Sequence, residues 1–425
     1  MQANIPKKLK EPANRKKRFL IVLCSFTAVF TLLFCRVFYL QIIQGPSLVQ
    51  RALSQWTRVT SVEPKRGDIV DRNGEVLAQS GTADTVLLYP KKIAEAGNAQ
   101  TIADTLAPLL GMDAAAILEK AQDTSKSEVW LKRQIDRDVA DQIRALNLTG
   151  VGFMVDTKRY YPKGDFLTQV LGFTSVDGEG LEGVEAYYNK YLAGTPGELR
   201  AQTDVKGNEI AFGEEYYVPA TDGYTVSLTI DYVIQSFVEK ACADAYAQYN
   251  PKGVMCIAMD PNTGEILALC NKQSYDLNSP PRDDTETLNE LSRNRILADA
   301  NDPGSIFKVF TMAAALDTGQ TKDSETFTCN GSIKVQNTTI RCTSTHGTVD
   351  LKTGLAKSCN PVFVTLALRM GTDTMYDYLK NFGFGSKSGV DMSAEASGIV
   401  IPRENVTDND LARIGFGQSI STTPI

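Results

Sequence analysis

One long apolar segment near the N-terminus restricts how this chain of 425 residues can fold. Residues 19–35 read FLIVLCSFTAVFTLLFC and carry no charge, and apolar character continues beyond Arg36 to Ile43. A helix needs roughly 20 apolar residues to cross a bilayer, and basic residues before it keep the N-terminus in the cytoplasm. We therefore predict a basic cytoplasmic tail over 1–18, a transmembrane helix over 19–43 and an extracytoplasmic remainder.

A cleavable signal peptide is the alternative interpretation of this segment. Such a peptide has a shorter apolar core and a small-residue cleavage site of the A-x-A kind. The segment that follows, RVFYLQ, offers no such site, and no second long apolar run occurs downstream. We therefore expect the helix to remain as a single-pass anchor.

The residues between the anchor and position 220 form a first predicted domain, over 44–220. Asn73-Gly74 lies between two short apolar runs, which is a strong hairpin signal. Residues 99–121 have helical periodicity with a break at Gly111. No cluster of metal-ligating residues occurs in this part. We interpret it as a non-catalytic domain of mixed helices and strands.

The pattern changes near residue 221, and a second domain is predicted over 221–425. Residues 231–249 read as a helix, and its apolar face carries Val233, Ile234, Phe237, Val238, Ala241, Cys242 and Ala245. Residues 253–260 and 265–270 are two β runs joined by PNTG, a probable hairpin. Helical patterns dominate afterwards, and no βαβ alternation appears. The fold class is therefore α+β, with an antiparallel sheet and a helical part.

Composition excludes two classes of function. The net charge is −6 and no basic stripe follows the N-terminus, so a nucleic-acid partner is not expected. The chain contains one histidine, His346, in the turn-like segment STHGTVD. We interpret His346 as a structural or surface residue, and we expect neither a metal nor a cofactor.

A site for acyl transfer without histidine begins at Ser305-Ile-Phe-Lys308. A lysine whose pKa is lowered by burial can serve as the base for a serine nucleophile. Spacing of three places Ser305 and Lys308 on one helical face, and Ser305 follows Pro303-Gly304 at the helix start. The positive end of the helix dipole there favours an anionic oxygen.

A second element, Ser358-Cys359-Asn360, follows 53 residues after Ser305. A second hydroxyl can relay a proton, and an asparagine amide can donate and accept hydrogen bonds at once. The triplet Lys352-Thr353-Gly354 lies just upstream, in an amphipathic helical pattern. A Lys-Thr-Gly triplet can also be part of a serine acyl-transfer site. We interpret its occurrence here, without a strand pattern, as a coincidence.

Together, these motifs resemble those of the class B penicillin-binding proteins. S-x-x-K, S-x-N and K-T-G are the marks of these enzymes and their β-lactamase relatives. The resemblance extends to RGDIVDRNGEVLA, RYYPKGDF, MDPNTGEILALCN and PGSIFKVFTMAAALDTG, and so covers most of the chain. It implies a pedestal or dimerisation domain over 44–220 and a serine β-lactamase-like transpeptidase domain over 221–425. Division-type and sporulation-type branches both fit.

The resemblance implies peptidoglycan cross-linking at a bacterial cell membrane. Ser305 would attack the penultimate D-Ala of a stem peptide, and Lys308 would accept its proton. Ser358 would relay a proton to the leaving amine, and Asn360 would hold substrate or the Lys308 amine. The implied partners are stem peptides of lipid II-derived strands, β-lactams, a membrane-embedded SEDS-family glycosyltransferase and a second copy of the chain.

The family's K-T-G lies on a strand after S-x-N, and no such triplet follows Asn360 here. We therefore expect a chain cut within the transpeptidase domain and incomplete as a catalyst. Two alternatives stay open: a non-catalytic scaffold relative, and a β-lactamase or antibiotic sensor.

Cysteine spacing gives one further prediction. Cys329 and Cys342 flank the hairpin-like stretch NGSIKVQNTTIR, outside the membrane, where disulfides can persist. We expect a disulfide between them. Since the pair lies between the two motifs, the bridge could make acylation redox-sensitive.

Overall fold

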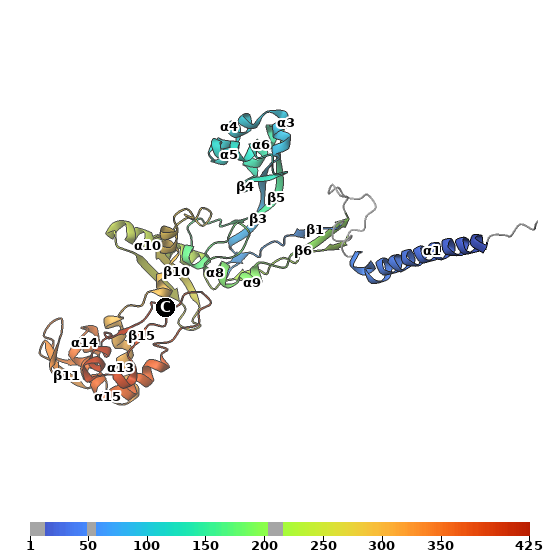
Figure 1. Cartoon of the computed structure of the whole chain (residues 1–425). Helices are drawn as coiled ribbons and strands as arrows, with labels where there is room; N and C mark the ends of the chain where they lie inside the picture. The colour runs from blue at the N-terminus through green and yellow to red at the C-terminus, as the bar shows by residue number, and fades with distance from the viewer. Residues whose placement is uncertain (1–12, 49–56, 203–215) are drawn as a thin grey trace, which may run out of the picture. The chain divides into compact units, whose positions relative to one another are not determined.

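The computed structural model describes residues 13–48, 57–202 and 216–425 (Figure 1). The chain divides into two compact units, one of residues 1–64 and 195–221 and the other of residues 65–194 and 222–425. Most of the predicted basic tail, residues 1–12, lies outside the described residues. The second unit contains residues from both sides of the predicted domain boundary at residue 220. The division into domains over 44–220 and 221–425 therefore stays a prediction.

The first unit contains the helix α1, Ala13–Phe38, and the π-helical turn η1, Tyr39–Ile43. Large apolar side chains on α1 are exposed, with Phe19 at 71% and Phe34 at 72% of full exposure. The continuous helical stretch Lys17–Ile43 is long and apolar enough to cross a membrane. The predicted apolar helix is therefore confirmed, and its role as an anchor stays a prediction.

The same unit contains a three-stranded antiparallel sheet of order β1-β6-β7. Its register pairs Val62 with Gly197 and Glu198 with Val218. The strands are β1, Thr57–Val62; β6, Gly197–Gln202; and β7, Tyr216–Val218.

The second unit begins with a five-stranded sheet in which β4, β3, β2 and β8 follow in order and β5 pairs with β3. The strand β3 is long enough to pair with β2 at its start and with β4 and β5 further along. The strands are β2, Ile69–Val70; β3, Val76–Leu88; β4, Val129–Ile135; β5, Val151–Tyr160; and β8, Val226–Ser227.

The predicted Asn-Gly hairpin joins β2 to β3 and is confirmed. The Asp71 carboxylate accepts hydrogen bonds from the backbone N–H groups of Asn73 (2.7 Å) and Glu75 (2.8 Å). Gly74 has φ of +89°, a conformation that costs glycine little. The turn is therefore fixed by local residues, which explains why the sequence predicted it.

Helices cover the far part of this sheet and enclose a core with Val86, Leu88 and Leu131 (Figure 1). The predicted helical stretch 99–121 forms α4 and α5, and it breaks where Gly111 closes α4 with φ of +61°. The helices are α3, Pro90–Ala96; α4, Ala99–Leu110; α5, Ala114–Gln122; and α6, Arg137–Ala145.

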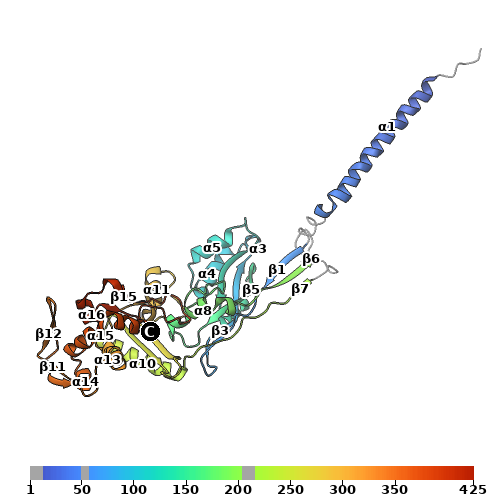
Figure 2. The same cartoon turned by 90° about the horizontal axis from the view of Figure 1, so that it is seen from below.

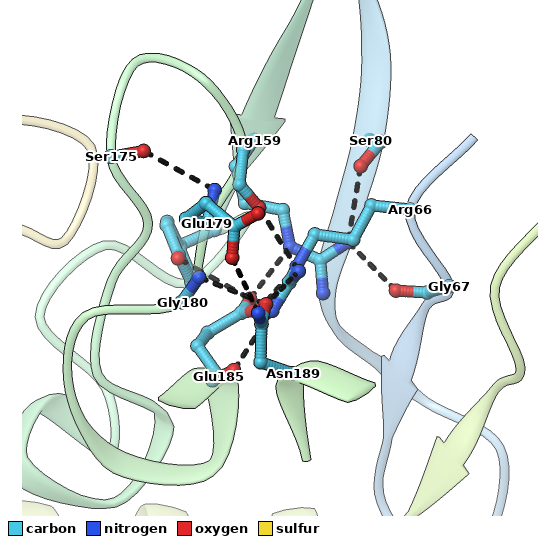
Figure 3. A network of polar contacts seen from close by, with 11 residues as sticks. Arg66, Gly67, Ser80, Arg159, Ser175, Glu179, Gly180, Glu185 and Asn189 are labelled. Atoms are coloured by element: carbon cyan, nitrogen blue, oxygen red, sulfur yellow. Dashed lines mark hydrogen bonds and ion pairs between the residues drawn. The ribbon is translucent and has the colours of Figure 1, made fainter. Parts of the chain in front are cut away.

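A buried ionic network holds the base of the sheet to short helices that follow β5 (Figure 3). Glu185 is fully buried and accepts from Nε of Arg66 (2.7 Å) and Nε of Arg159 (2.6 Å). Arg66 also donates to the Asn189 side chain at 2.7 Å. The helices are α7, Thr168–Leu171; α8, Gly183–Tyr187; and α9, Asn189–Leu192.

The chain then forms α10, Tyr232–Tyr249, and the antiparallel hairpin of β9, Val254–Met259, with β10, Ile266–Lys272. The hairpin confirms the prediction. Gln235 on α10 is buried and exchanges hydrogen bonds with both backbone groups of Leu269 on β10. The predicted apolar face is covered only in part, because Cys242 is buried whereas Val233 and Phe237 are 58% and 71% exposed.

A helical subdomain follows, with a core that includes Phe307, Phe363 and Leu411. In Figure 2, its β12–β13 hairpin projects away from the helices. Two short helices precede the subdomain, α11, Thr285–Ser292, and α12, Arg295–Ala298, and they pack on a different core. The helical elements of the subdomain are η2, Gly304–Phe307; α13, Lys308–Asp317; α14, Leu351–Ala356; α15, Asn360–Asn381; η3, Arg403–Asn405; and α16, Asp408–Ile414. The strands are β11, Thr326–Cys329; β12, Ser332–Val335; β13, Thr338–Arg341; β14, Gly347–Asp350; β15, Ile399–Val400; and β16, Ile420–Ser421.

A third core joins residues on both sides of position 220 within the second unit. It includes Ile69 and Leu77 from the early sheet and Leu269 and Ile296 from the later part. The early sheet and the later domain are therefore packed as one body. The α+β fold class is confirmed.

Candidate active site

The nucleophile candidate Ser305 lies in the 3-10 turn η2, which runs directly into α13. Gly304 takes φ of +59° and starts the turn. Ser305 is exposed, whereas Lys308, one turn later, is 1% exposed. Because Ser305 and Lys308 are three residues apart on the helical turn, the exposed Ser305 hydroxyl lies beside the buried Lys308 amine, as predicted.

The second motif lies between α14 and α15. Ser358 has φ of +51°, a left-handed conformation that is uncommon for a residue other than glycine. Asn360 is the first residue of α15, and Pro361 follows in the first turn. The triplet Lys352-Thr353-Gly354 lies inside α14 and not on a strand, so its interpretation as a coincidence is confirmed.

The two motifs meet at Lys308. Its Nζ lies 3.1 Å from Oγ of Ser305, 2.8 Å from Oγ of Ser358 and 2.8 Å from Oδ1 of Asn360. It also lies 2.8 Å from the carbonyl oxygen of Ser358. The two serine hydroxyls are 2.8 Å apart. All four residues predicted from the sequence are therefore brought together, across 53 residues of chain.

The surroundings of Lys308 favour an uncharged amine. Burial lowers the pKa of Lys308, and the nearby thiols of Cys342 and Cys359 offset this only in part. Its four hydrogen-bonding partners are all uncharged groups. The two N–H bonds of a neutral amine can donate to the Ser358 carbonyl and the Asn360 amide oxygen, which leaves the lone pair for the hydroxyls.

Asn360 is itself held in place. Its Nδ2 donates to the carbonyl oxygen of Arg341 at 2.8 Å, which forces Oδ1 to face Lys308. The phenyl ring of Phe363, one turn along α15, lies 5.7 Å from the Lys308 amine. Both contacts orient groups that the acyl-transfer chemistry would use.

Gly417 belongs to the surroundings of this site, although no motif in the sequence predicted it there. The backbone N–H of Gly304 donates to the Gly417 carbonyl at 2.9 Å, and Thr311 on α13 bonds the Gly415 carbonyl. A Cβ at Gly417 would lie 2.0 Å from the Gly304 carbonyl oxygen, and φ there is +82°. The segment after α16 thus supports the turn of Ser305, and its glycines were the signal available in the sequence.

The predicted Cys329–Cys342 disulfide is not formed in this structure, where both residues are free thiols. Their sulfurs lie in a cluster with Cys359 and His346, whose ligand atoms are all within 4.8 Å of one another. The sequence analysis placed neither of these two residues there. Three sulfurs and one imidazole nitrogen at such distances form a ligand set that a metal ion can use.

Two family models match the chain. Residues 61–228 match the penicillin-binding protein dimerisation domain, and residues 254–425 match the penicillin-binding protein transpeptidase domain. A crystal structure of a peptidoglycan synthetase from Bifidobacterium adolescentis superposes with a TM-score of 0.65 at 27% identity. That likeness covers 86% of this chain and 70% of the other.

Curated relatives align along almost the entire chain. Stage V sporulation protein D of Bacillus subtilis is 35% identical over 415 residues, which are 96% of this chain and 63% of the relative. Peptidoglycan D,D-transpeptidase FtsI of Escherichia coli is 30% identical over 428 residues, covering 99% of this chain and 71% of the relative. The chain thus spans about two thirds of the length of these relatives. With both domains in family order and the S-x-x-K and S-x-N residues in contact, this chain belongs to the class B penicillin-binding proteins.

Proposed function

We propose that this protein is a peptidoglycan D,D-transpeptidase that works through an acyl ester on Ser305. The observation that carries the proposal is the contact of one buried amine, Lys308, with the hydroxyls of Ser305 and Ser358 and the amide of Asn360. Since family membership alone does not establish activity, the roles below rest on this geometry.

In the acylation step, the Lys308 amine takes the proton of the Ser305 hydroxyl as its oxygen attacks the penultimate D-Ala carbonyl carbon. The C–N bond to the terminal D-Ala then breaks. Ser358, 2.8 Å from both Lys308 and Ser305, passes the proton to the leaving amine, which departs as free D-Ala. Such positioned proton transfer contributes typically about 10²–10⁴-fold to rate.

In the second step, an amine of a neighbouring stem peptide attacks the ester carbonyl carbon. The C–O bond to Ser305 breaks, a proton from the attacking amine passes to the Ser305 oxygen, and a new amide cross-links two strands. The Ser305 backbone N–H supplies one donor for the oxyanion, and loss of such a donor typically costs about 10²–10³-fold in rate. β-Lactams acylate Ser305 by the same attack on their ring amide.

The proposal places the protein in the bacterial cell membrane, with α1 as a single-pass anchor and both domains outside. Its stem-peptide substrates would come from lipid II-derived strands. A membrane-embedded SEDS-family glycosyltransferase and a second copy of the chain are the partners that the family suggests. Support for the anchor is the length and apolar surface of α1.

Two alternatives have less support. A non-catalytic scaffold has no need for Ser305 and Lys308, yet both are present and in contact. A β-lactamase needs a base that activates water, and the four partners of the Lys308 amine include no carboxylate.

Labelling with a fluorescent penicillin tests the proposal on the full-length product of the gene. We expect a stable covalent label that Ser305→Ala abolishes and that Ser332→Ala, a matched change on the exposed face of β12, leaves intact. An absent label favours a scaffold, and rapid loss of label favours a β-lactamase. A label that survives Ser305→Ala refutes the assignment of the nucleophile.

A further inference from the structure

The cysteine and histidine cluster beside the active site has the composition of a metal centre. Cys329, Cys342, His346 and Cys359 offer three sulfurs and one nitrogen, all within 4.8 Å of one another. Cys329 and Cys359 are fully buried. Three thiols and one imidazole form one of the usual ligand sets of structural zinc sites, and soft sulfur ligands favour zinc over hard cations.

Two distances between donors are close to those of tetrahedral zinc. Zn–S bonds of about 2.3 Å and Zn–N bonds of about 2.0–2.1 Å put two sulfurs about 3.8 Å apart, and a sulfur and a nitrogen about 3.6 Å apart. The sulfurs of Cys342 and Cys359 are 4.0 Å apart, and Sγ of Cys342 lies 3.6 Å from Nδ1 of His346. A disulfide would need sulfurs at about 2.05 Å.

The groups around the ligands also suit a metal. Nε2 of His346 lies 2.8 Å from Oγ of Ser344, a contact that fixes the ring and leaves Nδ1 free to coordinate.

The fold explains why four residues in a C-x12-C-x3-H-x12-C pattern converge. Antiparallel pairing of β11 with β14 puts Cys329 opposite Gly347, next to His346. Cys342 follows β13, and its N–H bonds the Gly331 carbonyl at the base of the hairpin. Cys359 immediately precedes the first residue of α15. The ligands thus come from β11, from the segment between β13 and β14 and from the start of α15, which also meet in one apolar core.

We propose that these four residues bind one zinc ion in a closed, structural site. Cys359 stands between Ser358 and Asn360, so the ion would fix the S-x-N motif to the base of the β12–β13 hairpin. Arg341, whose carbonyl holds the Asn360 amide, immediately precedes Cys342 and would be fixed by the same ion. The site positions catalytic groups and takes no part in the bond changes.

Metal content of the full-length protein, purified without chelators and under mild reduction, tests the proposal. We expect about one zinc per chain by mass spectrometry of metals. We expect Cys342→Ser and His346→Gln to lose most of it, and Cys256→Ser, a free thiol on β9, to retain it. Zinc below a tenth of an equivalent in the parent protein, with no uptake on titration, would overturn the proposal.

Cobalt substitution keeps the test valid if the variants fail to fold. Co²⁺ added to zinc-depleted parent protein should give the charge-transfer and intense d–d bands of a tetrahedral thiolate site. Octahedral spectra, or peptide mapping that finds Cys329 and Cys342 bridged in native protein, would refute the zinc site and favour the disulfide. None of these readouts depends on transpeptidase activity. A failure of the proposed function would therefore leave the zinc proposal standing, and the two failures can be told apart.

Discussion

Glu185 gives a stability prediction whose size follows from its surroundings. The side chain is fully buried, and its two oxygens accept from Arg66 and Arg159, whose side chains are 7% and 4% exposed. The hydroxyl of Tyr161 lies 3.3 Å from the same carboxylate. Glu185→Gln keeps the shape but leaves two buried guanidinium groups with no anion between them.

Loss of one partner of a buried ion pair lowers the free energy of unfolding by about 3–5 kcal/mol, because the remaining charge stays buried away from water. Here one carboxylate serves two arginines, so we expect the upper part of that range. An exposed pair provides the matched control: Glu290→Gln removes a partner of Arg295 where the glutamate is 69% exposed. Removing a partner of such an exposed ion pair lowers the free energy of unfolding by about 0–1 kcal/mol.

Urea unfolding, followed by tryptophan fluorescence and by circular dichroism, measures both variants. We expect a much lower midpoint for Glu185→Gln and a midpoint close to the parent for Glu290→Gln. Equal, small shifts in both variants would refute the claim that this network holds the sheet to the helices that follow it.

Three further predictions concern the active site. Lys308→Met should slow acylation by penicillin at least about 10²-fold with little loss of folded protein, measured by stopped-flow labelling and circular dichroism. Lys352→Ala should leave the acylation rate unchanged, because its triplet lies in α14, and a large loss would contradict this. Gly417→Ala should slow acylation and lower the melting temperature, because its Cβ would meet the Gly304 carbonyl at 2.0 Å. A parent-like rate would show that this contact does not support Ser305.

Local patterns explain what the sequence predicted correctly. The hairpin at Asn73-Gly74 and the break at Gly111 depend on backbone conformations that a few adjacent residues fix. Ser305 and Lys308 are three apart, so helical geometry alone brings them together. Their contact with Ser358 followed only from the family resemblance, because nothing local joins residues 53 positions apart.

What the sequence did not predict depends on long-range packing. Of the four metal-type ligands, two were predicted to form a disulfide, His346 was interpreted as structural, and Cys359 was noted only as part of Ser358-Cys359-Asn360. Their meeting depends on the pairing of β11 with β14. The support that Gly417 gives to Gly304 crosses more than a hundred residues. Helix α10 shows the same limit, since periodicity marked Val233 and Phe237 but not which face other elements cover.

The most direct test of the proposed function is the mass of the peptide that carries Ser305 after reaction with a D-Ala-D-Ala stem peptide. We predict an acyl adduct on Ser305 with one equivalent of D-Ala released, and conversion of the adduct to a new amide when an acceptor amine is added. Release of D-Ala with Ser305 unmodified and another residue acylated would contradict the account.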